Sequence, residues 1–282
     1  MPTWFITGAG RGLGLAMAEK ALESGANVVA TGRDATQIEA AFAGSASERV
    51  LSVALDVTSE HQAVAAVEAA IDRFGGIDVV VNNAGRGLLG AVEEASAAEV
   101  EAVFATNVFG LLSVVRAVLP HLRSRGQGHI VNIGSMGGFA QVAGWGVYGA
   151  TKFAVEGLTE AMRAELAPLG IGVTVVEPGS FRTDFLDATS LHATAREIAD
   201  YAGTAGRVRH AAAAANHGQL NDPAKGAEAI HTAVTSPNPP LRLQLGPDAV
   251  AMVEDKLEFV RKELDEWRAL GSSTLLTADD GR

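Results

Sequence analysis

A tyrosine and a lysine four positions apart offer the clearest acid–base chemistry in this sequence. Tyr148 and Lys152 stand in the stretch YGATK, and at helical spacing they lie on one face. A free tyrosine has a pKa of about 10, roughly three units too high for a useful base at neutral pH. A neighbouring ammonium favours the ionised phenol. The spacing therefore predicts a proton-transfer pair in which Tyr148 is the acid or the base.

A serine upstream of this pair can stabilise charge on a substrate oxygen. Ser135 ends the apolar run GHIVNIGS at 128–135, where its hydroxyl can hydrogen-bond a carbonyl or alkoxide oxygen on which charge develops. Alone, a Tyr-x-x-x-Lys pair usually lies on a solvated surface, and a serine in such a place usually forms a turn. The order of serine, tyrosine and lysine favours an active site. The histidines have no metal-ligand spacing, and we expect no metal.

A glycine-rich stretch near the start of the chain, TGAGRGLG, predicts a phosphate-binding loop. It departs from the G-x-G-x-x-G fingerprint, because Leu13 stands where a pattern begun at Gly8 needs a glycine. It follows a predicted strand at 3–7 and opens a predicted helix at 12–24. Backbone N–H groups at a helix start favour an anionic pyrophosphate, and glycines let the backbone approach it.

The spelling Thr7-Gly8-x-x-x-Gly12-x-Gly14 resembles that of the short-chain dehydrogenase/reductase family. Further stretches are similar to that family in the same order along the chain, roughly from residue 3 to 240. They are LDV at 55–57, NNAG at 82–85, ATNVFG with Asn107, VNIGSMGG with Ser135, YGATK, and EPGSFRT with Thr183.

The resemblance implies roles for individual residues. It implies a catalytic tetrad of Asn107, Ser135, Tyr148 and Lys152, in which Lys152 also holds the nicotinamide ribose and Asn107 keeps a water that passes protons to the lysine. Asp56 would contact the adenine and Thr183 the nicotinamide amide. The cofactor-binding residues that we expect are Gly8, Gly10, Arg11, Gly12, Leu13, Gly14, Arg33, Asp56, Val57, Asn83, Ala84, Gly85, Tyr148, Lys152, Pro178, Gly179, Phe181 and Thr183.

The end of the second predicted strand favours NADP as the cofactor. Enzymes that use NAD carry an acidic residue there for the ribose hydroxyls, and this sequence has Gly32. Arg33 follows, and Arg11 lies in the glycine loop, so two guanidinium groups could converge on a 2′-phosphate. Asp34 leaves NAD as an alternative cofactor, because a shift of one position in the predicted end of the strand would put its carboxylate near the ribose.

Short apolar runs alternate with helical patterns and predict an α/β fold. We expect a Rossmann-type, doubly wound three-layer sandwich with a parallel sheet of about seven strands. The predicted strands are 3–7, 27–31, 49–57, 77–83, 128–135, 171–179 and 241–245, and the clearest helices are 12–24, 59–74, 99–122 and 149–169.

Two later segments depart from this alternation of strands and helices. Residues 1–245 are expected to form the dinucleotide-binding and catalytic domain, within which 183–220 has no clear strand and is predicted to be a mobile substrate lid. Residues 246–282 are expected to add an amphipathic helix and tail to the same domain. Docking on its own domain is favoured for this helix, with a subunit contact as the alternative. Its apolar stripe is Val250, Val253, Leu257, Val260, Leu264 and Trp267.

Composition excludes several classes of partner. The chain has 282 residues, 48% of them hydrophobic, and a formal net charge of −11, which argues against nucleic acid or an anionic membrane. It has no cysteine, no expected signal peptide, and no uncharged apolar run of the roughly 18 residues that a membrane span needs. We expect a cytoplasmic protein. The family resemblance and the apolar helices at 99–122 and 149–169 imply a homotetramer or homodimer.

The sequence thus predicts an NADP(H)-dependent oxidoreductase that interconverts a ketone or aldehyde and an alcohol. The residues expected near the tetrad are mainly apolar, which favours an apolar small-molecule substrate. An NAD(H)-dependent enzyme of the same family, an epimerase or dehydratase with a keto intermediate, and a non-catalytic NADP-binding regulator remain alternatives. The expected apolar residues are Met136, Phe139, Val142, Trp145, Phe181, Phe185 and Leu186.

Overall fold

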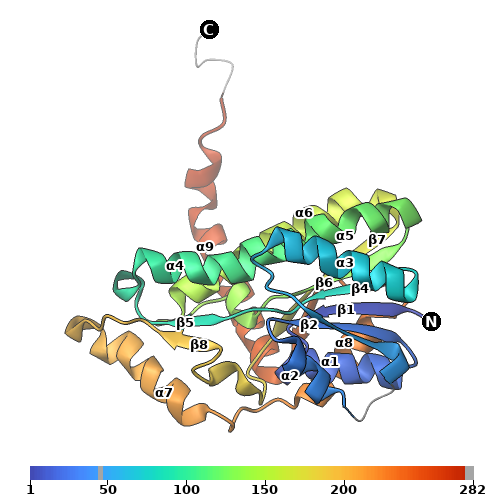
Figure 1. Ribbon diagram of the computed structural model, residues 1–282. Coiled ribbons are helices and arrows are strands. Elements are labelled where there is room, and N and C mark those ends of the chain that lie inside the picture. The colour runs from blue at the N-terminus through green and yellow to red at the C-terminus, as the bar shows by residue number, and fades with distance from the viewer. Residues whose placement is uncertain (44–46, 277–282) are drawn as a thin grey trace.

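The computed structural model describes residues 1–43 and 47–276 of the chain. Within these ranges, seven strands form one parallel sheet in the order β3-β2-β1-β4-β6-β7-β9. The predicted Rossmann-type fold is confirmed (Figure 1). The strands are β1 (Thr3–Thr7), β2 (Asn27–Gly32), β3 (Val50–Ala54), β4 (Val79–Asn82), β6 (Gly128–Ile133), β7 (Ile171–Pro178) and β9 (Arg242–Leu245).

The strand order reverses between β1 and β4, and this reversal fixes where a ligand can bind. From β1 the chain proceeds to β2 and β3 on one side, and from β4 it proceeds to β6, β7 and β9 on the other. In open parallel sheets the crevice at the carboxyl ends of such strands is the usual ligand site. The glycine loop follows β1 and the NNAG turn follows β4, so both lie at this crevice.

Helices cover both faces of the sheet. Buried side chains of α3, α5 and α6 pack on one face, and those of α1, α2 and α8 pack on the other (Figure 1). The four clearest predicted helices are present, but the short helix α2 was not predicted. The bounds are α1 (Gly12–Glu23), α2 (Ala35–Ala41), α3 (Glu60–Phe74), α4 (Ala97–Phe104), α5 (Leu111–Arg125), α6 (Gly146–Leu166), α7 (Arg207–Ala215), α8 (Pro223–Val234) and α9 (Pro247–Ser272).

A π-helical turn, Ala105–Gly110, joins α4 to α5, so that Ala97–Arg125 runs as one long helix. This helix is apolar enough to cross a membrane by length and composition alone, with a mean hydropathy of 1.9 over its most apolar stretch. Half of that stretch is buried inside the protein, as a core helix of a soluble fold would be.

The segment predicted to be a lid is more regular than its sequence pattern indicated. The sequence predicted no clear strand in 183–220, and this prediction was wrong, because β8 (Leu191–Ala193) pairs in parallel with β5 (Gly87–Leu89). A Cβ on Gly87 would come within 2.6 Å of the Leu191 side chain, so glycine permits this close pairing. The helix α7 follows in the same segment.

The last helix, α9, leaves the body of the molecule. Ala249 and Val253 in its first turns are buried against the domain. The remaining turns project away from the other elements (Figure 1). Leu257, Leu264 and Trp267 are therefore more than half exposed, at 55%, 56% and 57%.

Candidate active site

The glycine loop presents the open start of α1 to a cavity. Gly8 and Gly12 have φ angles of +66° and +56°, a region that favours glycine. A Cβ on Gly14 would collide with the carbonyl oxygen of Gly8, so the loop and helix approach each other closely only with glycine there. The side chain of Arg11, the N-cap residue, does not cap the start of α1. The free N–H groups of this first turn fit an anionic phosphate group.

The NNAG turn is fixed to the glycine loop by side-chain hydrogen bonds. Thr7 Oγ1 accepts from the backbone N–H groups of Asn83 and Ala84, at 2.9 and 3.0 Å. The Asn83 side-chain amide donates in turn to the carbonyl oxygens of Thr7 and Gly8, at 2.8 and 3.1 Å. The two turns at the carboxyl ends of β1 and β4 therefore form one rigid wall of the crevice.

At the end of β2, Asp34 is engaged in local structure. Its side chain caps α2 and accepts hydrogen bonds from the backbone N–H groups of Thr36 and Gln37 at 2.9 and 3.4 Å. Gly32 ends the strand, and a Cβ there would come within 2.8 Å of Ile38. Arg33 lines the cavity beside them.

Arg11 contacts the segment 183–220, which was predicted to be a lid. Its guanidinium donates to Thr189 Oγ1 and Ser190 Oγ, both at 2.7 Å. Arg11 and Arg33 line the same cavity, and the expectation that they flank one phosphate stays a prediction. The hydroxyl groups that bind the Arg11 guanidinium are distant from it in the sequence, and no local sequence pattern predicts such partners.

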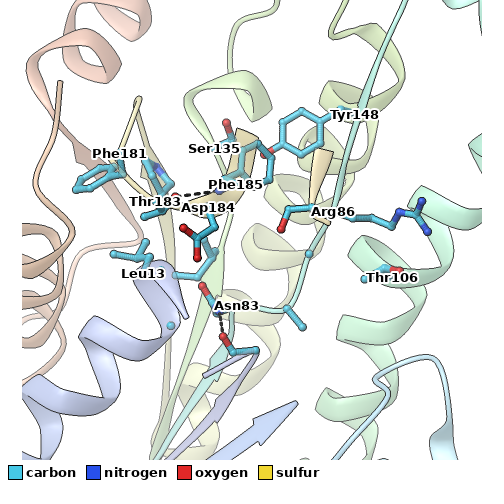
Figure 2. Close-up of a pocket in the computed structure, with 18 of the residues that line it drawn as sticks. Leu13, Asn83, Arg86, Thr106, Ser135, Tyr148, Phe181, Thr183, Asp184 and Phe185 are labelled. Carbon is cyan, nitrogen blue, oxygen red and sulfur yellow. Dashed lines mark hydrogen bonds between the residues drawn. The ribbon is translucent and has the colours of Figure 1, made fainter. Parts of the chain in front are cut away.

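The expected serine, tyrosine and lysine meet at the other end of the cavity. Tyr148 and Lys152 lie on α6, and Ser135 follows β6. The Lys152 ammonium donates to the carbonyl oxygen of Ile133 at 2.7 Å and lies 5.8 Å from the centre of the Tyr148 ring. Figure 2 shows Ser135 and Tyr148 beside Phe185.

Burial has the largest effect on the pKa values of Tyr148 and Lys152. It raises the pKa of Tyr148 to about 12, against a smaller lowering from the hydrogen bond with Ser135. Burial also lowers the pKa of Lys152 to about 8. In the protein alone, the pKa of the phenol is therefore raised, whereas the spacing had suggested a lowered value, because burial disfavours the charged phenolate. The phenol is protonated at neutral pH.

Asn107 stands behind the cavity on the π-helical turn. Its side chain accepts from the backbone N–H of Arg86 and donates to the Arg86 carbonyl oxygen, both at 2.9 Å. It also donates to Thr151 Oγ1 at 3.0 Å. π-helical turns inside α-helices often occur at functional sites. Here the turn links the loop after β4 to α6 beside Lys152.

All the expected cofactor-binding residues, together with Ser135, line one cavity of about 940 Å³. Most of the apolar residues expected near the tetrad line it too, as do Gln141 and Met252. Phe139 does not: its ring lies 6.0 Å from the Arg242 guanidinium, so it packs behind the site.

Several residues of the cavity were not found from the sequence. His192 on β8 lines it, and burial together with the charges of Arg86 and Arg33 lowers the pKa of this histidine, leaving it neutral at neutral pH. In Figure 2 the Arg86 side chain extends away from Ser135 and Phe185. Gln219 also lines the cavity, and its side-chain amide donates to the Thr183 carbonyl oxygen at 3.4 Å. These residues come from three distant segments without a shared motif.

Comparison with known proteins identifies the family of the chain. The model of a protein family described as short chain dehydrogenase matches residues 2–193. The chain belongs to the short-chain dehydrogenase family. An oxidoreductase of Botryotinia fuckeliana is 38% identical to it over 95% of this chain and 97% of its own length. A 3-ketodihydrosphingosine reductase of Bacteroides thetaiotaomicron is 36% identical over 86% of this chain and 87% of its own.

Solved structures of similar proteins share the fold. A short-chain dehydrogenase from Streptomyces avermitilis superposes with a TM-score of 0.90 and 38% identity, over 98% of this chain and all of that one. A family member from Burkholderia phymatum in complex with NAD gives 0.81 and 28%, over 93% and 95% of the two chains. A serine dehydrogenase complexed with NADP+ gives 0.74 and 28%, over 87% and 94%. Nicotinamide dinucleotides of both kinds therefore occur among the relatives.

Proposed function

We propose that this member of the short-chain dehydrogenase family is an NADP(H)-dependent oxidoreductase that interconverts a ketone or aldehyde and an alcohol. One observation carries the proposal. Ser135, Tyr148 and Lys152 line the same cavity as the open start of α1 and Arg33. Groups for proton transfer and groups for an anionic cofactor thus share one space.

A bound reduced nicotinamide supplies the hydride, and the chain supplies the proton and the polar contacts. Tyr148, whose pKa of about 12 keeps it protonated, donates its proton to the oxygen of the substrate as negative charge develops there. The Ser135 hydroxyl donates a hydrogen bond to the same oxygen. The Lys152 ammonium, held at the Ile133 carbonyl, stabilises the phenolate that remains. In the oxidation direction Tyr148 accepts the proton.

The preference for NADP(H) rests on Arg33 and on Asp34. Arg33 follows the uncharged Gly32 and lines the cavity, while the Asp34 carboxylate is occupied by the start of α2. The positive charges of Arg33 and Arg86 both lower the pKa of His192, which lines the same cavity. A 2′-phosphate would be held by a charge-assisted hydrogen bond from Arg33.

The substrate class follows from the lining near Tyr148. The Trp145 ring lies 5.5 Å and the Phe185 ring 5.7 Å from that of Tyr148, and Met136 and Leu186 extend the apolar wall. This wall supports an apolar carbonyl compound. The name of the Bacteroides relative, a 3-keto compound reductase, agrees with a ketone.

A panel of apolar ketones and aldehydes tests the proposal, with NADPH and NADH compared by absorbance of the reduced cofactor. We expect NADPH oxidation with at least one ketone, a lower kcat/KM with NADH, and loss of turnover in Tyr148→Phe. Tight NADPH binding without turnover on any substrate would instead indicate a regulator. A product altered at carbon without net cofactor oxidation would indicate an epimerase or a dehydratase.

We further propose that the protein is a cytoplasmic homotetramer or homodimer. The outer faces of the long helix and of α6 expose Phe109 and Phe153, at 59% and 45%. Exposed aromatic side chains on neighbouring helices suit a contact between subunits. Light scattering should give a mass of two or four chains at micromolar concentration, and a mass of one chain would contradict this.

A further inference from the structure

The outer part of α9 carries an apolar stripe that the described residues leave uncovered. Leu257, Val260, Leu264 and Trp267 alternate at spacings of three and four and are exposed at 55%, 44%, 56% and 57%. Single exposed apolar residues are common on protein surfaces, but four on one face of a projecting helix form a contiguous patch. Figure 1 shows that this part of the helix stands clear of the sheet and of the other helices.

The stripe continues a face that is buried where α9 begins. Val253, on the same face, is 8% exposed because it packs against the domain. Val250, one turn earlier, is 43% exposed at the edge of the domain. From Val250 to Trp267 the pattern keeps a seven-residue repeat, with Val250, Leu257 and Leu264 in one position and Val253, Val260 and Trp267 in the other. This repeat is that of a helix that pairs with another helix.

We propose that the outer part of α9 binds the α9 of a second copy of this chain as an antiparallel helix pair. The two copies would be related by a two-fold axis close to Leu257 and Val260, so that Leu257 of each copy faces Val260 of the other. Leu264 of the second copy then lies beside Val253, where the helix leaves the domain. Trp267 of the second copy covers the half-exposed Val250.

Charge complementarity supports this partner and this register. Residues that flank the stripe carry both signs, with Glu254 and Arg261 on one side and Lys256 and Glu263 on the other. In the antiparallel register, Glu254 of one copy faces Arg261 of the other, and Lys256 faces Glu263. All four flanking contacts of the symmetric pair therefore join opposite charges, an arrangement that sets the orientation of paired helices.

The same charges disfavour a membrane surface as the partner. Between Glu254 and Arg268 the helix has six acidic and four basic residues. Helices that lie on anionic lipid carry a surplus of lysine and arginine on the polar face. A helix with an acidic surplus is repelled by anionic lipid. In the proposed helix pair the flanking charges face opposite charges, so the surplus causes no repulsion between them.

The first experiment compares the mass of the full-length protein with that of two matched variants, by sedimentation and light scattering at micromolar concentration. Leu264→Asp places a charge in the stripe and should halve the mass of the assembly. Ala269→Asp introduces the same residue on the opposite, exposed face and should leave the mass unchanged. Circular dichroism checks that both variants keep their helix content. A monomeric wild type, or equal masses for all three proteins, would overturn the proposal.

A charge exchange tests the orientation without altering the apolar stripe. Arg261→Glu should raise the dissociation constant at least tenfold, because Glu254 of the second copy then faces a like charge. Adding Glu254→Arg to it should restore wild-type association, while Lys262→Glu, on the far face, should have little effect. A double variant as weak as the single one overturns the antiparallel register. Co-flotation of the wild type with neutral or anionic lipid vesicles, with no change in mass in Leu264→Asp, would identify a membrane instead.

Discussion

Tyr148 is a buried acid whose pKa lies far above neutral pH in the protein alone. Tyr148→Phe removes the transferable proton but keeps the ring that packs between Trp145 and Phe185. We expect turnover to fall about 10²–10⁴-fold, the usual contribution of a general acid or base. NADPH affinity, measured by fluorescence titration, should stay nearly unchanged. Retention of more than roughly a tenth of the activity would contradict the assigned role of Tyr148.

The direction of the pKa shift of Tyr148 also predicts opposite pH profiles for the two reaction directions. Alcohol oxidation needs the phenolate, which becomes more abundant as the pH rises toward the raised pKa of about 12. Ketone reduction needs the protonated phenol, which is already the main form at neutral pH. Initial rates between about pH 6 and 9 should therefore rise for oxidation and change little for reduction. Identical profiles in both directions would argue against Tyr148 as the proton-transfer group.

Arg33 should discriminate between the two nicotinamide cofactors. A hydrogen bond to a charged group contributes about 1.5–3 kcal/mol, so Arg33→Ala should weaken NADPH binding by roughly 10- to 150-fold. NADH lacks the 2′-phosphate and serves as the control, because its affinity should hardly change. Titration of both cofactors against both proteins decides the point. Equal losses for NADPH and NADH would show that Arg33 supports the fold of the loop.

Sequence reasoning succeeded for residues whose position follows from the end of a strand or from the spacing on one helix. Ser135 and Tyr148 line the predicted cavity for this reason. It did not predict the partners of Arg11, and it was wrong to place Phe139 at the cavity, because the direction of a side chain depends on contacts across the fold. The partners of Arg11, Thr189 and Ser190, are distant in sequence, and Arg242 lies above Phe139 across the fold.

At the scale of elements, α6, β7 and β9 bring two carboxyl groups together behind the active site. Glu156 lies one turn after Lys152 on α6, and Glu177 lies on β7. Arg242 on β9 donates to Glu156 at 3.0 Å and lies 3.6 Å from Glu177. Burial, with the negative charge of Glu177, raises the pKa of Glu156 to about 7. Burial also raises the pKa of Glu177, so the pair favours holding a proton.

This pair should make stability depend on pH. The pKa of Glu156 rises on folding from its ordinary 4.5 to about 7, so its contribution is complete below about pH 4.5 and is lost as the pH rises through 7. Glu156→Gln keeps the uncharged form and should lessen this loss, by on the order of 2 kcal/mol at pH 8. Urea unfolding at pH 5 and pH 8 measures the difference. Glu160→Gln, at the exposed partner of Arg242, is the control and should keep the wild-type pH dependence.

The segment 183–220, predicted to be a lid, is held in its later part by a buried carboxylate. Glu94 has no exposed side-chain surface; it accepts from the backbone N–H of Ile198 at 2.9 Å and forms an ion pair with Arg209 on α7. We predict that 183–220 gains hydrogen-exchange protection with NADPH mainly near Thr189 and Ser190, which contact the glycine loop through Arg11. The part held by Glu94 should be protected already. Equal protection with and without NADPH throughout the segment would contradict a lid.

Helices and strands with a strong apolar periodicity could be predicted from the sequence. Elements that depend on pairing with a segment distant in the sequence could not. Buried valine-rich strands and long amphipathic helices follow from local pattern, which explains the success with β6, β7 and α6. The strand β8 depends on β5, about a hundred positions earlier, and α2 is a helix of seven residues started by the Asp34 cap. Such short elements carry too few residues for a period to emerge.

For the whole molecule, one sheet draws on most of the chain. Seven of the described strands, from β1 at Thr3 to β9 at Leu245, pair in a single layer, and the cavity lies at the reversal of their order. The composition and the alternation of patterns were sufficient for this architecture. The same patterns did not predict that α9 would leave the domain. An apolar stripe has the same sequence pattern whether it packs against its own chain or against another chain.

The position of Arg242 on the last strand bears on how a newly synthesised chain folds. Glu156 and Glu177 leave the ribosome long before the cation that lies between them. Parallel strands also need long loops to close before their pairing stabilises anything, which makes such sheets slow to form. Until β9 arrives, the nascent chain holds two carboxyl groups in a half-built core and an unpaired edge on β7. That interval is when aggregation competes with folding and when a chaperone would have the most effect.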